Sequence, residues 1–254
     1  MRVALITQDD PFFLAENIDY LIRQLPQDAE LVACILFEVS AFGKKTSFVK
    51  QALETKAIFG TKFFLRYGMK YVLNKFNKNK KISHVLRKHN IPLVSLEKNI
   101  NHNSSITTIS DYSPDLLVSI AGNQIFKKPI INLAPKGCLN LHTALLPKYR
   151  GLLPTFWVMK NKEKETGVSV FFVDEGIDSG PILVQKKVTI GNLTQEELIQ
   201  HTKKIGMDSI IESIQKIQSG NYKLIDNPNE EMSYFSKPKR ADVEVFLEGG
   251  NRFF

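Results

Sequence analysis

Stretches of consecutive apolar residues recur along the chain, and each is typical of a strand buried on both faces of a sheet. Between the first two, a turn at residues 8–11 precedes a predicted helix over residues 12–25. A strand, a helix and a second strand in this order indicate a parallel sheet. We therefore expect an α/β fold with a mostly parallel central sheet and helices on both faces. The predicted strands are residues 1–7, 31–37, 91–96, 115–120, 137–142, 168–173 and 182–190.

A long helix is predicted after the last strand, because Thr194 and Glu197 have the spacing of a capping box. It runs to about residue 218 and is followed by a tail with a short acidic helix. We expect residues 1–190 to form a core, with residues 191–254 as a helix and tail packed on it. The turn after the first strand lacks the Gly-x-Gly-x-x-Gly pattern, which argues against a dinucleotide site.

Positive charge is concentrated in one segment. The net charge is +8, and residues 44–88 hold thirteen Lys or Arg against one acid, which leaves 21 cations and 25 acids elsewhere. We expect this segment to be a basic helical insertion in the core, with helices over residues 61–77 and 80–89. Residues 100–113 are predicted to form a loop with a short helix.

The spacing in residues 61–77 predicts a cationic amphipathic helix. Its apolar set is Leu65, Met69, Val72 and Phe76, and its basic set is Lys62, Arg66 and Lys70. Three interpretations fit this pattern: an ordinary surface helix with a solvated basic face, contact with an anionic membrane, or binding of a phosphorylated substrate.

Composition narrows the class of protein. No apolar stretch approaches the roughly 20 residues that span a bilayer, and Asp9 and Asp10 follow the first strand too closely for a signal peptide. We therefore expect a soluble, cytoplasmic protein. Cys34 and Cys138 each lie in an apolar run, which favours two buried, unpaired thiols. No cluster of metal-ligand residues is present in the sequence pattern, so no metal is expected.

The stretch from residue 137 to residue 181 carries the candidate chemistry. Asn140 and His142 are two positions apart in a predicted strand, so their side chains lie on the same face. Asp178 follows the next predicted strand, in a loop where Gly176 and Gly180 allow the backbone to wrap around a ligand. We expect the amide, the imidazole and the carboxylate to meet at adjacent strand ends, as a site for acyl transfer.

These residues resemble the folate-dependent formyltransferases, the family of glycinamide ribonucleotide transformylase, methionyl-tRNA formyltransferase and the sugar N-formyltransferases. The resemblance covers about residues 115–190 and rests on several elements in the same order. They are residues 140–142, 145–151, 165–168 and 174–180. The resemblance implies a Rossmann-like formyltransferase fold and transfer of a formyl group from 10-formyltetrahydrofolate to a primary amine.

The resemblance also implies catalytic roles. Asn140 and a protonated His142 would donate hydrogen bonds to the carbonyl oxygen as it gains negative charge, and one such donor typically contributes ~3 to 4 kcal/mol. Asp178 would orient His142 and help to move the proton of the attacking amine. No covalent intermediate with the enzyme is needed.

Binding roles follow from the same resemblance. Two loops are expected to line the folate pocket, and the loop after His142 is expected to meet the substrate. The folate candidates are Asn123, Gln124, Ile125 and Phe126, with Asp174, Glu175, Gly176 and Ile177, and the substrate candidates are Lys148, Tyr149 and Arg150. Trp157, the single tryptophan, is expected in the core.

The acceptor is inferred by exclusion. Methionyl-tRNA formyltransferase carries a separate C-terminal domain, whereas about sixty residues follow Ile190 here. Glycinamide ribonucleotide transformylase has a Gly- and Ser-rich phosphate loop after its first strand, where this chain has Asp9 and Asp10, which would repel a phosphate. We therefore expect the 3- or 4-amino group of a nucleotide-linked amino sugar, in surface polysaccharide biosynthesis.

Other interpretations stay open. The chain could be a methionyl-tRNA-type or other amine formyltransferase, a formyl-folate hydrolase in which water replaces the amine, or a non-catalytic scaffold that binds a polyanion or a membrane. The partners considered are a phosphorylated small-molecule amine, a membrane surface against residues 44–88, and a second copy of the chain in a homodimer. Nucleic acid is not favoured, although a basic insertion in a comparable place contacts RNA in methionyl-tRNA formyltransferase.

Overall fold

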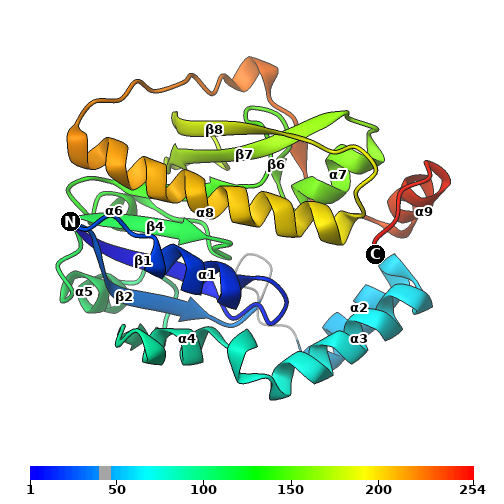
Figure 1. The fold of residues 1–254 in the computed structure, drawn as a ribbon, viewed down its shortest axis with the longest axis horizontal. Helices are drawn as coiled ribbons and strands as arrows, with labels where there is room; N and C mark the ends of the chain where they lie inside the picture. Colours follow the sequence, from blue (N-terminus) through cyan, green and yellow to red (C-terminus); the bar gives the residue numbers. More distant parts are fainter. Residues whose placement is uncertain (40–46) are drawn as a thin grey trace.

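A computed structural model describes residues 1–39 and 47–254. In this part of the chain the central element is a seven-stranded sheet in the order β3-β2-β1-β4-β5-β7-β8 (Figure 1). Lys44 and Lys45, at the start of the basic segment, lie outside the described residues. The strands of the sheet are β1 (Arg2–Gln8), β2 (Glu30–Phe37), β3 (Leu93–Val94), β4 (Leu116–Ile120), β5 (Cys138–His142), β7 (Glu165–Phe172) and β8 (Ile182–Thr189).

The direction of the strands confirms the expected fold class. The five strands from β3 to β5 pair in parallel, and β7 and β8 add two antiparallel strands at the other edge. Strand β3 is limited to two residues, shorter than the predicted range 91–96. Pro92, which has no N–H to donate, comes just before it, and such short edge strands expose few unpaired backbone groups.

Helices cover both faces of the sheet. Successive residues of β1 alternate between the two sides: Val3 and Leu5 belong to one core cluster, and Ala4 and Ile6 to another. The first cluster is closed by α1 and α8, which lie across the face nearest the viewer in Figure 1, and by α4. The second is closed by α5 and α6. The bounds are α1 (Leu14–Arg23), α4 (Ile82–Lys88), α5 (Asn103–Ser110), α6 (Lys128–Ile131) and α8 (Gln195–Ser219).

Helix α8 begins and ends as its sequence predicts. The Thr194 hydroxyl accepts a hydrogen bond from the Glu197 N–H at 3.3 Å, and the Glu197 carboxylate accepts one from the Thr194 N–H at 2.7 Å, so the capping box is present. The helix ends at Gly220, whose φ of +67° is the left-handed conformation of a helix C-cap.

The tail after α8 forms a third core with the segment that follows β5. Strand β6 (Arg150–Gly151) pairs with β9 (Tyr234–Phe235) in a second, two-stranded sheet. Helices α7 (Pro154–Lys160) and α9 (Arg240–Glu248) pack beside it, and α7 contributes the buried Trp157. A single-turn 3-10 helix, η2 (Asn229–Glu231), precedes β9.

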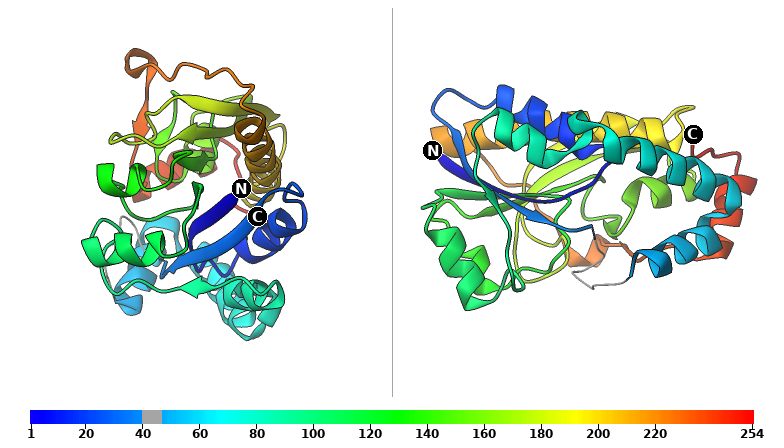
Figure 2. Two further views of the ribbon diagram at one scale, coloured as in Figure 1. Left: turned by 90° about the vertical axis from the view of Figure 1, so that its left-hand side faces the viewer. Right: turned by 90° about the horizontal axis from the view of Figure 1, so that it is seen from below.

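The basic segment forms two helices, α2 (Phe48–Phe59) and α3 (Thr61–Phe76), and a 3-10 turn, η1 (Lys78–Lys80), that leads into α4. Helix α2 was not predicted from the sequence. The two helices lie at the end of the molecule where α9 is found, and α2 contacts α9 (Figures 1 and 2).

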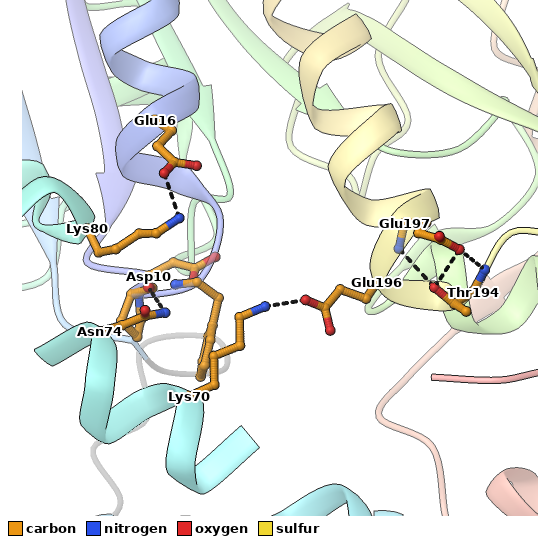
Figure 3. A network of polar contacts seen from close by, with 10 residues as sticks. Asp10, Glu16, Lys70, Asn74, Lys80, Thr194, Glu196 and Glu197 are labelled. Atoms are coloured by element: carbon orange, nitrogen blue, oxygen red, sulfur yellow. Dashed lines mark hydrogen bonds and ion pairs between the residues drawn. The ribbon is translucent and has the colours of Figure 1, made fainter. Parts of the chain in front are cut away.

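The orientation of α3 differs from that of an ordinary surface helix with a buried apolar face, although Lys62 and Arg66 of its basic set are exposed. Lys70 forms an ion pair with Glu196 at the start of α8 (Figure 3). The guanidinium of Arg66 lies 4.3 Å from the centre of the Phe254 ring. The apolar set faces outward instead, and the side chain of Phe76 is 81% exposed. The physical reason is a competing aromatic stripe. Phe63 and Tyr67 stack at 4.3 Å and take the inner side of the helix.

Two features are absent from residues 1–39 and 47–254. None of the helices there combines the length and the apolarity that crossing a bilayer demands. The same residues contain no group of three or more His, Cys, Asp or Glu arranged to hold a metal ion. Both cysteines are free and buried, and burial raises the pKa of the Cys34 thiol to about 12.

Candidate active site

A cavity of about 780 Å³ lies where β1, β4 and β5 end. Open parallel sheets bind ligands at the carboxyl ends of their strands, and this volume suits a substrate-sized molecule. Its walls come from the loops after β1, β4 and β5, from the loop between β7 and β8, and from the start of α7. Helix α8 and helix α2 close its other sides, through residues that include Lys203 and Glu54.

Asn140 and His142 both line this cavity from β5. His142 is 6% exposed, and its Nε2 lies 2.7 Å from the carbonyl oxygen of Tyr149. A carbonyl oxygen can only accept a hydrogen bond, so the ring must carry a hydrogen on Nε2. The other ring nitrogen, Nδ1, then faces the Oδ2 of Asp178 at 3.5 Å. The imidazole is thus held in one orientation, with Nδ1 directed toward the carboxylate.

Asp178 reaches His142 by a route different from the expected one. Because β7 runs antiparallel to β5, Ser169 pairs with His142, and the end of β7 lies beside the start of β5. The expectation of adjacent strand ends is therefore wrong. Instead the loop between β7 and β8 folds back, so that the Oδ2 of Asp178 accepts a hydrogen bond from the Gly151 N–H at 2.9 Å. Asp178 has a φ of +49°, a left-handed conformation that aspartate tolerates better than most residues.

Glycines allow the close approaches that this loop requires. A Cβ at Gly151, which has a φ of +99°, would lie 2.2 Å from the backbone oxygen of Phe235. A Cβ at Gly180 would lie 1.8 Å from the backbone oxygen of Phe172. Any side chain at either position would therefore displace the loop that carries Asp178.

The folate candidates fall into two groups. Seven of the eight line the cavity: Asn123, Gln124, Ile125, Phe126, Asp174, Gly176 and Ile177. Glu175 is not among its lining residues and forms an ion pair with Lys128 at 3.1 Å. The polar members hold the loops in shape: Gln124 accepts a hydrogen bond from the Ile100 N–H at 2.8 Å, and Asp174 accepts one from the Ser179 hydroxyl at 2.6 Å.

The apolar members fit a flat ring. Ile125 is 51% exposed and Ile177 is 39% exposed, although both belong to the cavity wall. Uncovered apolar side chains at the wall of a cavity favour a ligand with an apolar surface, because covering them removes that surface from water. The residues present therefore fit a pterin-like ring.

The substrate candidates Tyr149 and Arg150 occupy supporting positions in this structure. Tyr149 is buried, its ring stacks on Phe235 at 5.2 Å, and its hydroxyl donates to Glu163 at 2.6 Å. Burial raises the pKa of Tyr149 to about 12. Arg150 is 4% exposed and donates to the side chain of Asn229 at 2.7 Å. Lys148 is exposed, and none of the three is among the residues that line the cavity.

The side chains of Tyr149 and Arg150 turn inward because the loop after β5 pairs with β9. Arg150 and Gly151 form a strand beside Tyr234 and Phe235, and the tail that supplies β9 provides the hydrogen-bond acceptors. Burial lowers the pKa of the Arg150 guanidinium, the direction expected for a cation removed from water.

Sequence reasoning did not assign Gln8 or Lys203 to the site, and it considered Asp10 only as an obstacle to a phosphate, although all three line the cavity. Burial lowers the pKa of the Lys203 ammonium, while the charge of Asp10 acts in the opposite direction. The Oε1 of Gln8 is buried and has no hydrogen-bond partner among the described residues. The only signal for Lys203 was its place on α8, one turn after Ile199, which also lines the cavity.

Lys203 changes the electrostatic argument against a phosphate. Asp9 and Asp10 were expected to repel an anion, but Asp10 shares its cavity with the ammonium of Lys203, and its Oδ1 accepts a hydrogen bond from the Phe12 N–H at 2.6 Å. Asp9 is absent from the cavity lining, and burial raises its pKa. The cavity therefore presents a cation as well as a carboxylate to an acceptor.

Comparison with known proteins places these features in a family. Residues 1–214 match the sequence model described as formyl transferase. A methionyl-tRNA formyltransferase from Kosmotoga olearia is 32% identical over 178 residues, which make up 68% of this chain and 56% of that protein. The chain spans about half the length of the curated relatives it matches.

Solved structures share the fold. A sugar N-formyltransferase from Shewanella sp FDAARGOS_354 has 20% identity and a TM-score of 0.60, with 98% of this chain and 87% of that chain covered. An N-formyltransferase from Helicobacter canadensis, in complex with folinic acid and dTDP-3-aminofucose, has 18% identity and a TM-score of 0.59, with 97% and 79% covered. At these identities the similarity shows the fold.

Proposed function

Because the chain belongs to the formyl transferase family, we propose that it transfers the formyl group of 10-formyltetrahydrofolate to the 3- or 4-amino group of a nucleotide-linked amino sugar. The observation that carries this proposal is the wall formed by Asn140, His142 and Asp178 in a cavity of about 780 Å³. An amide donor, an imidazole and a carboxylate share one surface there, beside loops that fit a flat ring.

The proposed chemistry is attack of the amine nitrogen on the formyl carbon. As the new C–N bond forms, the carbonyl electron pair moves onto oxygen, and the amide of Asn140 donates a hydrogen bond to it. The attacking nitrogen loses a proton, and the folate nitrogen gains one when its bond to the formyl carbon breaks. His142 is suited to carry this proton on Nδ1, because Asp178 lies 3.5 Å away and its negative charge stabilises the imidazolium.

The donor is proposed to lie against the loops after β4 and β7. Ile125 and Ile177 would cover its ring, and the loop residues Asn123, Gln124, Phe126, Asp174 and Gly176 shape the pocket. The folinic acid in the Helicobacter canadensis protein supports a folate donor for this chain. Asp174 and Glu175 of the second loop have different roles, because Asp174 closes the turn and Glu175 pairs with Lys128.

The acceptor is proposed to enter from the side of Lys203. An ammonium and the unsatisfied Oε1 of Gln8 would receive an anionic, hydroxyl-bearing molecule such as a nucleotide sugar. The dTDP-3-aminofucose in the Helicobacter canadensis complex supports this class. Lys148 remains a proposed contact at the edge of the site, since it is exposed on the loop after β5. A role in surface polysaccharide synthesis follows from this acceptor.

Methionyl-tRNA is a second candidate acceptor, favoured by the identity to the Kosmotoga olearia protein. Against it, Lys70 of α3 pairs with Glu196, Arg66 lies over the Phe254 ring, and the outer side of that helix carries apolar residues. The partners of the proposal are therefore a small phosphorylated amine and the folate donor, in the cytoplasm, where the free thiols of Cys34 and Cys138 would stay reduced. Hydrodynamic measurement would show whether the chain forms a homodimer.

The experiment is an assay with 10-formyltetrahydrofolate and a panel of acceptors, read by mass spectrometry. The panel holds nucleotide-linked 3- and 4-amino sugars and aminoacylated initiator tRNA. A mass gain of one formyl group on an amino sugar supports the proposal, whereas formylation of the tRNA alone would overturn the acceptor. Release of folate without a formylated product would identify a hydrolase.

Asn140→Ala tests the catalytic assignment in the same assay. Loss of one hydrogen-bond donor to a developing oxyanion lowers kcat by roughly 10²- to 10³-fold. The matched control is Asn221→Ala, which removes the same group from an exposed position after α8. If the two variants had equal activity, the role of Asn140 would be refuted.

A further inference from the structure

Helix α3 presents a row of large apolar side chains to solvent. We call this row the outer stripe. Its members recur three or four residues apart and so lie on one face of a helix about 24 Å long. They are exposed by more than half of their surface: Leu65 by 63%, Met69 by 64%, Val72 by 53%, Leu73 by 65% and Phe76 by 81%.

The opposite side of α3 fixes this orientation. Tyr67 packs against Phe12 at 5.4 Å, the Asn74 amide donates to the backbone oxygen of Pro11 at 2.9 Å, and Lys70 pairs with Glu196 (Figure 3). The turn at Pro11 and Phe12 and the start of α8 thus hold the inner side of the helix. Turning the outer stripe inward would break all of these contacts, so its exposure is a property of the fold.

Cations surround the outer stripe. Lys62 and Lys75 on α3 and Lys78 in η1 are exposed. Residues 47–88 contain one acid, Glu54, and its carboxylate pairs with Lys237 at 2.9 Å. The neighbouring helix α2 repeats the pattern, with exposed apolar side chains at Val49 and Leu53. An apolar stripe bordered by lysines is the composition of a helix that lies in a membrane interface.

We propose that the outer stripe and its lysines hold this protein on an anionic lipid surface, with Leu65, Met69, Leu73 and Phe76 inserted among the acyl chains. The charge selects this occupant. Two copies of the chain, joined by these faces, would bring like charges together, because the stripe lies among cations with no free acid beside it on α2 or α3. RNA would be complemented by the lysines, but four of the five members of the stripe are aliphatic, and only Phe76 offers a base a surface to stack on.

Vesicle flotation tests the proposal with the whole chain. Vesicles of phosphatidylglycerol mixed with phosphatidylcholine are compared with vesicles of phosphatidylcholine alone. We expect binding to the anionic vesicles and a decrease in binding with salt, because the lysines are screened. The double variant Met69→Ser, Leu73→Ser should bind at least roughly tenfold more weakly, because it removes two inserted side chains. Lys75→Glu, Lys78→Glu should weaken binding to the anionic vesicles in particular.

Matched controls lie outside α2, α3 and η1. Leu247→Ser removes an apolar side chain that is 46% exposed on α9, and Lys223→Glu reverses a charge after α8. Both should bind like the unchanged protein, and every variant should keep its far-UV circular dichroism and its formyl transfer activity. The proposal is overturned if the unchanged protein does not float with anionic vesicles. It is also overturned if the serine variants bind normally, or if these variants instead convert a dimer to a monomer.

Discussion

At the scale of the residue, one hydrogen bond sets the orientation of His142. Its Nε2–H donates to the carbonyl oxygen of Tyr149, so Nδ1 is the nitrogen left for proton transfer. The carbonyl is in place because Tyr149, with a φ of +62°, turns the chain and buries its own ring against Phe235. Tyr149 and Arg150, which the sequence suggested as substrate contacts, therefore act on the catalytic group through the shape of their loop.

Lys203 provides a prediction at the same scale. Lys203→Met should raise the KM for an anionic acceptor by about 10- to 100-fold, because a hydrogen bond to a charged group contributes roughly 1.5 to 3 kcal/mol. The KM for 10-formyltetrahydrofolate should stay the same. Stability should not fall, since burial lowers the pKa of this ammonium and its removal relieves a desolvation cost. Steady-state kinetics and urea unfolding check the three expectations.

The neighbouring lysine is the control for that variant. Lys204→Met removes the same charge from the exposed side of α8 and should leave both KM values unchanged. The KM for an acceptor without phosphates should change little in Lys203→Met. Equal losses for the charged and the uncharged acceptor would contradict the assignment.

At the scale of the element, a group of charged side chains joins the middle of α1 to the end of α4. The Oδ1 of Asp19 on α1 lies 2.8 Å from the Nε2 of His89 and 3.0 Å from the Nζ of Lys88. The hydrogen bond from His89, followed by that from Lys88, lowers the pKa of Asp19 to about 2. The cations at the end of α4 also lie at the C-terminal end of the helix dipole, which stabilises positive charge.

This pair predicts a pH dependence of stability. The pKa of Asp19 is lower in the folded chain than its ordinary value of 3.8, so the carboxylate stabilises the fold above about pH 4. This contribution is lost as the pH falls from about 4 to about 2. Its size is at most about 2 kcal/mol, because the side chain is partly exposed. The free energy of unfolding of Asp19→Asn should therefore be lower than that of the unchanged protein at pH 6. The two values should converge near pH 2.

Asp226→Asn serves as the matched control for this measurement. Asp226 is exposed and forms no ion pair among the described residues. Its substitution should leave the pH dependence of unfolding unchanged. A difference for Asp19→Asn that stayed constant from pH 6 to pH 2 would show that the ion pair does not contribute.

At the scale of the whole molecule, the tail ties distant segments together. Backbone oxygens of Arg252 and Phe253 accept hydrogen bonds from the N–H groups of Gln195 and Glu196 at 2.8 and 3.0 Å, which satisfies donors at the start of α8. The ring of Phe253 packs on Phe63 at 4.9 Å. The tail thereby connects α3 to the helix that closes the main core.

Phe253→Ala tests this connection. The ring is 6% exposed, and truncation of a buried phenylalanine costs about 3 kcal/mol or more. We expect a lower midpoint of urea unfolding and weaker hydrogen-exchange protection of α3. Phe254→Ala is the control, because that ring is partly exposed beside Arg66 and should contribute about 1 kcal/mol or less. Equal effects of the two variants would contradict the connection of the tail to α3 through Phe253.

The sequence by itself located the strands of the main sheet, the start of α8 and three candidate catalytic residues. Apolar runs located the strands, the capping box located the start of α8, and Asn140, His142 and Asp178 were identified before their geometry was known. These signals are local, because they depend on residues that are close together in the chain. The roles of the three residues remain predictions until the assays above are done.

Only the tertiary structure decided how these parts face one another. The antiparallel direction of β7 determines how Asp178 reaches His142, and the pairing of β6 with β9 turns Arg150 inward. Lys203 lines the cavity because α8 crosses that end of the sheet. Helix α3 could bury either of two apolar stripes, and it buries the aromatic one because Phe12 and Phe253 lie beside it. Which face is buried depends on the apolar surface that distant segments supply, and local periodicity carries no information about those segments.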